Sequence, residues 1–430
     1  MQGKFAGKTL LVLGSNVGSN DIVKYAKENG AEVLVADYFS PERSSAKRIA
    51  DEHFLISTGD LESLEKLIQE RKIHGVLAGI HEFNLLSAME LSQRLGLPFY
   101  CTRRQWDLIE NKGEFRKMCE KHNVPHPQTY HTGGKVSPET WEIIQYPAVI
   151  KPVDASSSMG VFICETEVEM KSHVEDARKE SAIGEIIIEE CVCGDEFTAH
   201  YTIANGRVSL ASVDNRYPVA LKEGATTIPI ARVYPCLYLD EFMRQVNPSM
   251  LVLCADLELT DAILFIQGIY NSEKNSFYVF EGGLRSAGEA PFRFISKING
   301  INAMYVLVDH ALSTPSDFAS EKEDPTMQGK CCGVISFVTT GGKVGTIEGL
   351  EEAVEATASV IEYESRYPVG SETPCGNTLH QLMIRFVMIC DSREQMKNDI
   401  AYLNEHITVL DEHGNNMVLK MEPERLFGTK

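Results

Sequence analysis

The chain has 430 residues, of which 43% are hydrophobic and 24% charged, a composition typical of a soluble globular protein with roughly two to four domains. Its 61 acidic residues outnumber the 41 basic ones and leave a net charge of −20. A nucleic acid partner is therefore not expected, because phosphate backbones are bound chiefly by clustered Lys and Arg. No apolar run reaches the roughly 18 residues of a transmembrane helix, so we expect no membrane partner either.

The eleven cysteines are scattered and form no C-x-x-C pair. This spacing disfavours both a zinc site and a disulfide framework. The first residues lack the apolar stretch and small-residue cleavage site of a signal peptide. We therefore expect a cytoplasmic protein with reduced cysteines.

The first hundred residues alternate short apolar runs with helical patterns. We expect strands at 8–13, 31–37, 73–80 and 99–101 and helices at 21–29, 60–71 and 84–95. This order predicts an open parallel α/β domain. The glycine turn at 14–18 departs from the G-x-G-x-x-G pattern, so we interpret it as a tight turn over a helix N-terminus rather than a cofactor site. His81 and Glu82 follow the third strand, where loop residues often border a cleft.

The pattern changes near residue 106 and again in a polar, acidic segment at 314–328. Helices are expected at 111–122, 167–180 (with Thr166 as N-cap), 302–312 and 392–405, and C-terminal strands at 333–339 and 384–390. We therefore predict an α/β domain over 1–105, a central domain over 106–313 and a compact α+β domain over 314–430.

The segment YPAVIKPVDASSSMGVF is typical of a phosphate site. A strand at 147–150 delivers Lys151 at its end, and a small polar loop follows. The serines of this loop offer donors to phosphate, and Gly160 permits a close backbone approach. No Walker A pattern occurs in the chain, which disfavours a P-loop NTPase. Considered alone, the segment also fits a serine-rich surface loop.

The segment IIIEECVCGDEF offers contacts for a purine nucleoside. A strand at 186–188 ends in Glu189 and Glu190, and Glu196 follows after a turn. Backbone groups near Glu190 and Val192 are placed to read an adenine edge, and Glu196 to accept hydrogen bonds from ribose hydroxyls. Considered alone, this segment is equally an acidic, solvated hairpin.

Gln267 and Glu281 lie fourteen residues apart across an expected hairpin with strands at 262–269 and 277–280. Pairing of these strands brings the two side chains together, and Arg285 follows at the end of the second strand. Amide and carboxylate oxygens suit Mg²⁺ rather than zinc. On their own they are ordinary polar groups beside a hairpin.

Together these segments resemble the ATP-grasp superfamily, in which two α+β subdomains clamp ATP, and the resemblance covers roughly 111–309. It implies ATP-binding roles for Lys112, Lys151, Ser156, Ser157, Ser158, Gly160, Glu189, Glu190, Val192 and Glu196. It implies metal-binding roles for Gln267 and Glu281 and catalytic roles for Arg285 and Lys151. The fold it implies is a pre-ATP-grasp α/β domain, a two-subdomain ATP-grasp core and a small C-terminal α+β domain.

One position departs from the superfamily's Glu-x-Asn-x-Arg motif. Gly283 stands where Asn is usual, so a second metal ion loses an oxygen ligand. A water or Glu289 replaces that ligand, or metal binding is weaker. The segment GGKVGTIEGLEEA resembles the closing domain of bacterial L-amino acid ligases and biotin carboxylase-like members.

The resemblance implies an ATP-dependent ligase that uses Mg²⁺ or Mn²⁺. ATP would convert a carboxylate into an acylphosphate, and an amine would attack it to form an amide or peptide bond. Lys112, Lys151 and the metal would neutralise charge on the transferred phosphoryl group. Both substrates would be small molecules.

Arginine and lysine side chains are the candidates for holding the substrate. Arg285 suits a carboxylate or a phosphoryl group, because a guanidinium pairs with either in bidentate fashion. Arg216, Lys222 and Arg293 are further candidates, with plain solvation as the alternative for each.

Two other functions remain open. The first is a bicarbonate-activating carboxylase or carbamoyl phosphate synthetase relative, which Gln267 favours. The second is a nucleotide-binding protein without ligase activity, which Gly283 favours. A homodimer is the commonest assembly for a soluble enzyme.

Overall fold

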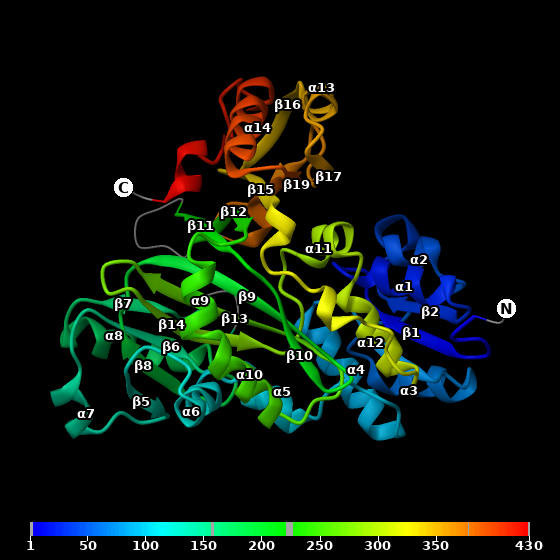
Figure 1. Ribbon diagram of the computed structural model, residues 1–430, viewed down its shortest axis with the longest axis horizontal. Coiled ribbons are helices and arrows are strands. Elements are labelled where there is room, and N and C mark those ends of the chain that lie inside the picture. The colour runs from blue at the N-terminus through cyan, green and yellow to red at the C-terminus, as the bar shows by residue number, and fades with distance from the viewer. Residues whose placement is uncertain (1–2, 156–158, 221–226, 377, 429–430) are drawn as a thin grey trace.

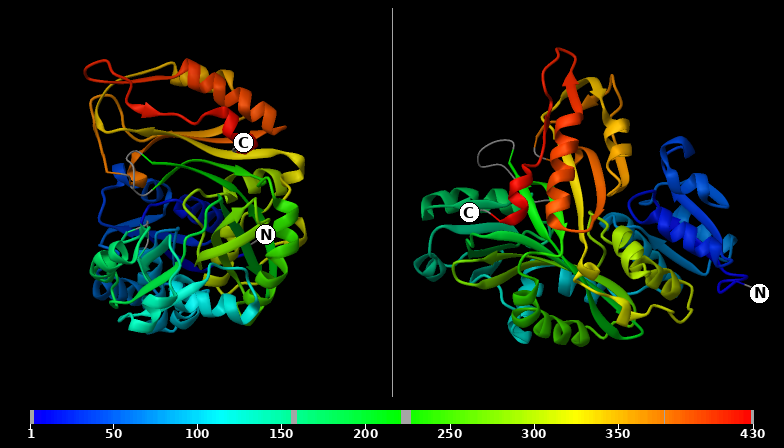
Figure 2. Two further views of the ribbon diagram at one scale, coloured as in Figure 1. Left: turned by 90° about the vertical axis from the view of Figure 1, so that its left-hand side faces the viewer. Right: turned by 45° about the horizontal axis from the view of Figure 1, so that its top comes forward.

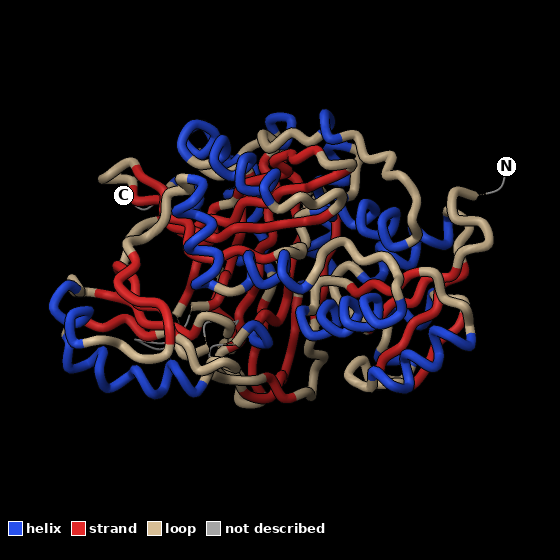
Figure 3. Tube along the Cα trace, turned by 90° about the horizontal axis from the view of Figure 1, so that it is seen from below, coloured by secondary structure: helices blue, strands red, loops and turns tan. Residues whose placement is uncertain are grey.

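The protein is described here from a computed structural model that covers residues 3–155, 159–220, 227–376 and 378–428. Three large units are visible in Figure 1: a parallel sheet near the N-terminus, a long central sheet, and a third sheet at the end away from the N-terminus. We call this third sheet, built from residues 129–190, the clamping sheet. Figure 3 shows the same three units from below, with the central sheet between the other two. The C-terminal part of the chain, coloured orange to red, continues the central sheet at its upper end (Figure 2).

The N-terminal unit is a four-stranded sheet of order β3-β2-β1-β4 in which every pairing is parallel. Its strands are β1 (Thr9–Leu13), β2 (Glu32–Asp37), β3 (Glu52–Leu55) and β4 (Gly75–Ala78), and its helices are α1 (Ser19–Glu28), α2 (Ser45–Ile49), α3 (Leu61–Glu70) and α4 (Glu82–Leu95). All five residues of β1 are buried, which explains its continuous apolar sequence. The predicted parallel α/β unit is confirmed.

A helix from far along the chain completes this unit. Helix α12 (Ala303–Ala311) packs against α1. The rings of Tyr25 and Tyr305 stack with their centroids 3.9 Å apart, and the Tyr25 hydroxyl lies 3.0 Å from a carboxylate oxygen of Asp309. The N-terminal core therefore includes residues about 200 positions beyond its last strand.

Two details of this unit differ from the predictions. Residues 99–101 form no strand: the Phe99 carbonyl lies 3.1 Å from a ring nitrogen of His310 and has no ladder partner. Strand β3 was not predicted from the sequence. It is a short edge strand, and only its alternate residues are half-buried, so its apolar signal is weak.

The clamping sheet is antiparallel, with order β5-β8-β6-β7. Its elements are β5 (Thr129–Gly133), α7 (Pro138–Ile143), β6 (Ala148–Pro152), β7 (Phe162–Cys164), α8 (Glu167–Lys179) and β8 (Ile186–Glu190). Thr166 caps α8 through a bond from the Glu169 backbone N–H, as predicted. Strand β6 extends beyond the predicted range: Pro152 pairs with Ile186 inside the strand, because the neighbour on its other side has already ended.

The central sheet has ten strands, with the path β14-β13-β9-β11-β12-β15-β19-β17 and β10 and β21 beside it. These are β9 (Asp195–Ala204), β10 (Arg207–Val213), β11 (Asn215–Val219), β12 (Ile228–Tyr234), β13 (Ala262–Asn271), β14 (Ser276–Gly283), β15 (Cys331–Thr339), β17 (Val360–Ser365), β19 (Leu382–Cys390) and β21 (Val418–Leu419). The sheet continues through β12 and β15, across the boundary expected at residue 313.

The remaining elements connect these sheets or pack beside them. They are η1 (Pro41–Arg43), α5 (Arg103–Glu110), α6 (Lys112–His122), α9 (Leu239–Gln245), α10 (Asn247–Asp256), α11 (Phe292–Asn299), η2 (Ser320–Lys322), η3 (Met327–Gly329), β16 (Gly342–Glu348), α13 (Leu350–Ala356), β18 (Glu372–Thr373), η4 (Leu379–Gln381), α14 (Arg393–His406), β20 (Thr408–Asp411) and η5 (Pro423–Phe427). Strands β18, β16 and β20 form a small third antiparallel sheet at the C-terminal end.

Candidate nucleotide and metal site

Strand alternation gives the part of the central sheet around β9 and β13 one apolar and one polar face. In β9, Phe197 and Tyr201 belong to the same buried apolar cluster as Phe242 of α9 and Leu253 of α10. Their neighbours Thr198 and His200 point to the opposite face, because successive side chains alternate across a strand. That opposite face carries the predicted metal ligands.

Gln267 and Glu281 lie directly opposite each other in the pairing of β13 with β14. The predicted pairing of the two residues across a hairpin is therefore confirmed. The side chain of Glu281 is 28% exposed, and one of its carboxylate oxygens lies 4.0 Å from the Lys112 ammonium nitrogen. An amide and a carboxylate that face each other with partial access to solvent fit a hard divalent cation.

Lys112 is the first residue of α6, and its position is fixed by the helix start. Asn111 caps the helix by accepting bonds from the Gly113 and Glu114 backbone N–H groups. The Lys112 ammonium donates to the Ala155 carbonyl at 2.7 Å. It thus lies between the metal pair and the residue that precedes the predicted serine loop.

Lys151 is held by a buried ion-pair network. Its ammonium lies 2.6 Å from the Glu189 carboxylate, which also accepts a bond of 2.7 Å from the Arg116 guanidinium. Burial lowers the pKa of Lys151, although Glu189 opposes that shift. Burial raises the pKa of Glu189, but the nearby Lys151 and Arg116 outweigh it, and the net shift is downward.

Glu189 thus contacts Lys151, the lysine predicted to bind phosphate, whereas the sequence places Glu189 in the predicted adenine segment. Arg116 was missed by sequence reasoning. The signal was present, because Arg116 lies one helical turn after Lys112, and side chains four residues apart share a helix face.

The remaining adenine–ribose residues follow β8. The Glu190 backbone N–H donates to the Gln128 carbonyl at 2.9 Å, and Val192 lies half-buried in the loop between β8 and β9. The Glu196 carboxylate forms an ion pair with Arg216, its register partner on β11. Burial, followed by the charge of Arg232, lowers the pKa of Arg216 to about 9.

The other predicted site residues either make contacts that the sequence did not predict or lie outside the described part of the chain. Arg293 forms an ion pair of 2.6 Å with Glu362 of β17. Gly160 has a φ of 67°, and a Cβ there would meet Pro152 at 2.9 Å, so glycine is required. Residues Ser156, Ser157, Ser158 and Lys222 lie outside the described part of the chain.

A second charged cluster on the polar face surrounds Arg232. Its guanidinium lies 2.9 Å from Asp214 and 3.1 Å from Glu289, and His200 lies 3.3 Å from the same Glu289 oxygen. Among the described residues, His200, Asp214 and Glu289 form the one group of three His, Cys, Asp or Glu side chains close enough to share a metal ion. Arg232 already supplies their positive charge, and Glu289 is thereby engaged away from the Gln267–Glu281 pair.

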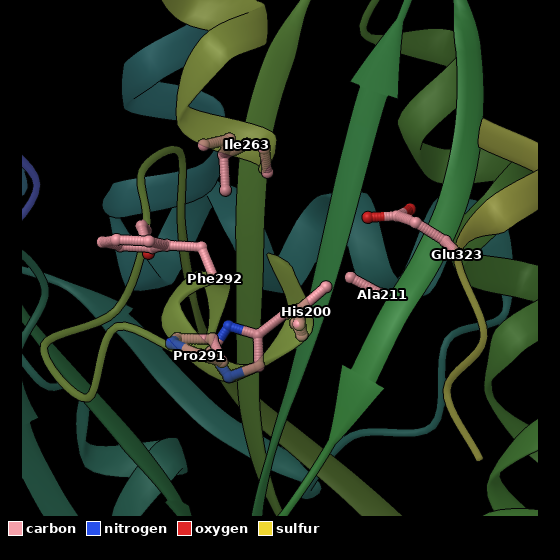
Figure 4. Close-up of a pocket in the computed structure, with 9 residues that line it drawn as sticks. His200, Ala211, Ile263, Pro291, Phe292 and Glu323 are labelled. Atoms are coloured by element: carbon pink, nitrogen blue, oxygen red, sulfur yellow. The ribbon is translucent and has the colours of Figure 1, made fainter. Parts of the chain in front are cut away.

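His200 also lines a small buried cavity near Pro291 and Phe292 (Figure 4). Glu323 lies on the far side of Ala211 from His200 in this view. Its carboxylate accepts a bond of 2.6 Å from the Thr202 hydroxyl, and burial raises its pKa to about 7.

Arg285, the predicted cation beside the metal pair, follows the end of β14. Its Nε lies 3.7 Å from the Glu110 carboxylate, and its guanidinium carbon lies 5.1 Å from the centre of the Phe265 ring. Glu110 accepts a bond of 3.0 Å from the Leu284 backbone N–H. Burial raises the pKa of Glu110 to about 7, although the charge of Arg285 lowers it. The charges of Glu82 and Glu281 also raise that pKa, which brings Glu82 of the predicted cleft into electrostatic reach.

Solved structures of several enzymes share this architecture. L-amino acid ligase from Bacillus licheniformis gives a TM-score of 0.76 at 18% identity, covering 94% of this chain and 99% of that one. The biotin carboxylase domain of Hydrogenobacter thermophilus 2-oxoglutarate carboxylase, solved with MgADP and bicarbonate, gives 0.77 at 15% identity, covering 98% and 94%. Phosphoribosylglycinamide synthetase from Anaerococcus prevotii gives 0.72 at 15% identity, covering 94% and 99%. The fold class is that of the ATP-grasp proteins.

Sequence comparisons identify a matching family model and several curated relatives. Residues 120–218 match the family model described as D-ala D-ala ligase C-terminus. Formate-dependent phosphoribosylglycinamide formyltransferase from Prochlorococcus marinus is 29% identical over 203 residues, which are 45% of this chain and 50% of that protein. Carbamoyl phosphate synthase large chain from Saccharolobus islandicus is 21% identical over 327 residues, 71% of this chain and 30% of that protein. The chain thus spans half or less of the length of these curated relatives.

These findings confirm the resemblance to the ATP-grasp superfamily, of the carboxylate–amine ligase type. Within the described residues, no helix is both long and apolar enough to cross a membrane.

Proposed function

We propose that the protein is an ATP-dependent ligase that activates a carboxylate as an acylphosphate and joins it to an amine. The observation that carries this proposal is the convergence of Lys112 from α6 with the Gln267–Glu281 pair from the central sheet. Lys151, from the clamping sheet, lies beside the same site, over the ring of Phe280 at 5.2 Å. These contacts support a site at which two lysines from separate units and the proposed metal ligands bind one triphosphate.

In the proposed reaction, a carboxylate oxygen of the first substrate attacks the γ-phosphorus and the bond to ADP breaks. The amine nitrogen of the second substrate then attacks the acyl carbon, phosphate leaves, and the nitrogen loses a proton. Lys112 and Lys151 bind phosphate oxygens, and Arg285 holds the substrate carboxylate or the transferred phosphoryl group. A bound Mg²⁺ would neutralise further charge on the phosphates.

The protein side chains account for much of the required positioning. Glu189, itself held by Arg116, holds the Lys151 ammonium in place, so that little side-chain entropy is lost when phosphate binds. The adenine and ribose contacts proposed for Glu190, Val192 and Glu196 follow from the likeness of IIIEECVCGDEF to the family segment. The family model covers all of these residues.

The test is ADP release by the full chain against a panel of carboxylic acids and amines, with mass detection of condensed products. The panel includes pairs of amino acids and, because one curated relative is named as formate-dependent, also formate. Lys151→Ala and Glu281→Ala are expected to lower turnover at least about 1,000-fold while far-UV circular dichroism is unchanged. Full activity in either variant would contradict the site assignment.

A second function is favoured by Gln267, the metal-ligand variant seen in carbamoyl phosphate synthetases. In that case bicarbonate would be the activated carboxylate, and ATP cleavage would depend on bicarbonate without an organic acid. If the nucleotide binds and neither bicarbonate nor any organic acid stimulates ADP release, the protein is a nucleotide-binding protein without ligase activity.

A further inference from the structure

Four residues form a square on the polar face of the central sheet. Gln267 pairs with Glu281, and Phe265 pairs with Gly283 one step along the same two strands. Positions two apart in a strand point to the same face. The Phe265 ring, the Gln267 amide, the Glu281 carboxylate and any side chain at position 283 would therefore share one patch of surface.

Phe265 occupies the space that a side chain at position 283 would need. A Cβ built on Gly283 would lie 2.2 Å and 2.4 Å from two carbons of the Phe265 ring. The φ of Gly283 is not in the left-handed region, so its backbone conformation is open to other residues. The ring, and not the backbone, therefore excludes a larger residue at this position.

The same ring supports the neighbouring cation. Phe265 is 3% exposed, and the guanidinium carbon of Arg285 lies 5.1 Å from the ring centre. A buried aromatic face attracts a cation and fixes its direction. The Nε of Arg285 is buried and has no hydrogen-bond partner, and its nearest carboxylate, that of Glu110, is 3.7 Å away.

The two other carboxylates described near this patch already have partners: Glu110 faces Arg285 and accepts a bond from the Leu284 backbone N–H. Glu289 is bound to Arg232 and His200. Glu281 belongs to no group of three potential metal-binding His, Cys, Asp or Glu side chains in the described ranges.

We propose that the ATP site binds one divalent cation, at Gln267 and Glu281, and that the Phe265 ring fills the place of a further metal ligand and holds Arg285 there as the second positive charge. This inference rests on the proposed function, because it assumes that ATP occupies the site. Phe265 is thus a positioning residue for Arg285, and Phe265 and Gly283 form a register pair of one large and one small residue.

The experiment counts metal ions bound with a nucleotide that cannot react. The full chain is mixed with a non-hydrolysable ATP analogue, and Mn²⁺ is titrated while free Mn²⁺ is measured by electron paramagnetic resonance. We expect one Mn²⁺ for each bound nucleotide. Two Mn²⁺ for each nucleotide would overturn the inference and leave the ligase proposal intact.

A paired variant tests the role of the ring. Phe265→Thr combined with Gly283→Asn removes the obstruction and supplies an amide oxygen, and we expect a second Mn²⁺ to bind. A folded double variant that still binds one Mn²⁺ would show that Phe265 does not determine the count. If this variant does not fold, the number of Mn²⁺ ions that the unchanged protein binds for each nucleotide still tests the proposal.

Phe265→Thr alone is the matched control. It is expected to keep one Mn²⁺ for each nucleotide, because position 283 still lacks an oxygen, and to lower turnover about 10-fold as Arg285 loses its aromatic support. Unchanged turnover would contradict the positioning role. Failure of the unchanged protein to bind the nucleotide at all would instead contradict the proposed function.

Discussion

The two charged clusters on the polar face of the central sheet differ in how completely the protein neutralises them. Around Arg232, the carboxylates of Asp214 and Glu289 are at most 5% exposed and both contact the same guanidinium. At the metal end, Glu281 is 28% exposed and its nearest cation, Lys112, is 4.0 Å away. The first cluster is closed by its own cation, whereas the second keeps oxygen atoms available to a ligand. One cluster therefore suits a structural role, whereas the other suits the binding role proposed for it.

The largest effect on stability is expected from opening the closed cluster. Arg232→Met leaves Asp214 and Glu289 buried without their cation, which should cost about 3–5 kcal/mol of unfolding free energy. Urea unfolding followed by circular dichroism measures this loss. Arg244→Met, which removes an exposed arginine paired with Glu241, is the control and should change stability by less than about 1 kcal/mol. Equal effects of the two substitutions would show that the Arg232 cluster is not structural.

A smaller, pH-dependent effect is expected at Glu110. Its folded pKa of about 7 lies above the value of an unfolded glutamate, so the folded state holds more protons between about pH 4.5 and 7, and stability falls as pH rises through that range. Glu110→Gln removes this penalty and should stabilise the protein by up to about 3 kcal/mol at pH 8 relative to its effect at pH 4. Urea midpoints at both pH values give the comparison. A difference independent of pH would place the Glu110 pKa near its ordinary value.

Gln267→Glu should make the Glu281 cluster more negative and so increase its difference in charge from the neutralised Arg232 cluster. A second carboxylate opposite Glu281 adds a negative charge that Mn²⁺ neutralises, so we expect Mn²⁺ affinity in the presence of nucleotide to rise about 10-fold, or about 1.4 kcal/mol. Without metal the two carboxylates repel each other, and the thermal midpoint should fall slightly. Isothermal titration with Mn²⁺ measures the first effect. Weaker Mn²⁺ binding would argue that Gln267 is not a metal ligand.

The smallest effect is expected at the ion pair between Arg293 and Glu362. Both side chains are partly exposed, and Glu362→Gln should cost less than about 1 kcal/mol. Turnover is expected to stay within about twofold, because Glu362 itself is not assigned to the site. A large rise in the KM of the carboxylate substrate would show that the pair holds Arg293 in position for substrate binding.

The sequence predicted those parts of the fold in which a strong local pattern carries the information. The buried strands of the parallel sheet, the Thr166 cap and the pairing of Gln267 with Glu281 all depend on residues close in the chain or across one hairpin. The order of the phosphate, adenine and metal segments led to the ATP-grasp superfamily, although each segment alone was ambiguous.

What could not be predicted depends on register between distant strands. Arg232 of β12 meets Glu289 of the loop that follows β14, and the sequence contains no local signal for that contact. The exclusion of a side chain at Gly283 is likewise visible only once Phe265 is known to be its register partner. The edge strand β3 was missed because half-exposed residues give a weak pattern.

Helix α12 joins the N-terminal unit to the rest of the chain a second time. The chain leaves that unit through α5, and it returns to it through α12 before entering β15. The clamping sheet, by contrast, is one continuous insertion between α6 and β9. The N-terminal unit is linked to the rest of the protein at two separate places, α5 and α12. It therefore resists hinge motion more than the clamping sheet, which the chain enters and leaves between α6 and β9. Opening for nucleotide exchange is therefore expected as a swing of the clamping sheet, with the parallel sheet and the central sheet moving as a single frame.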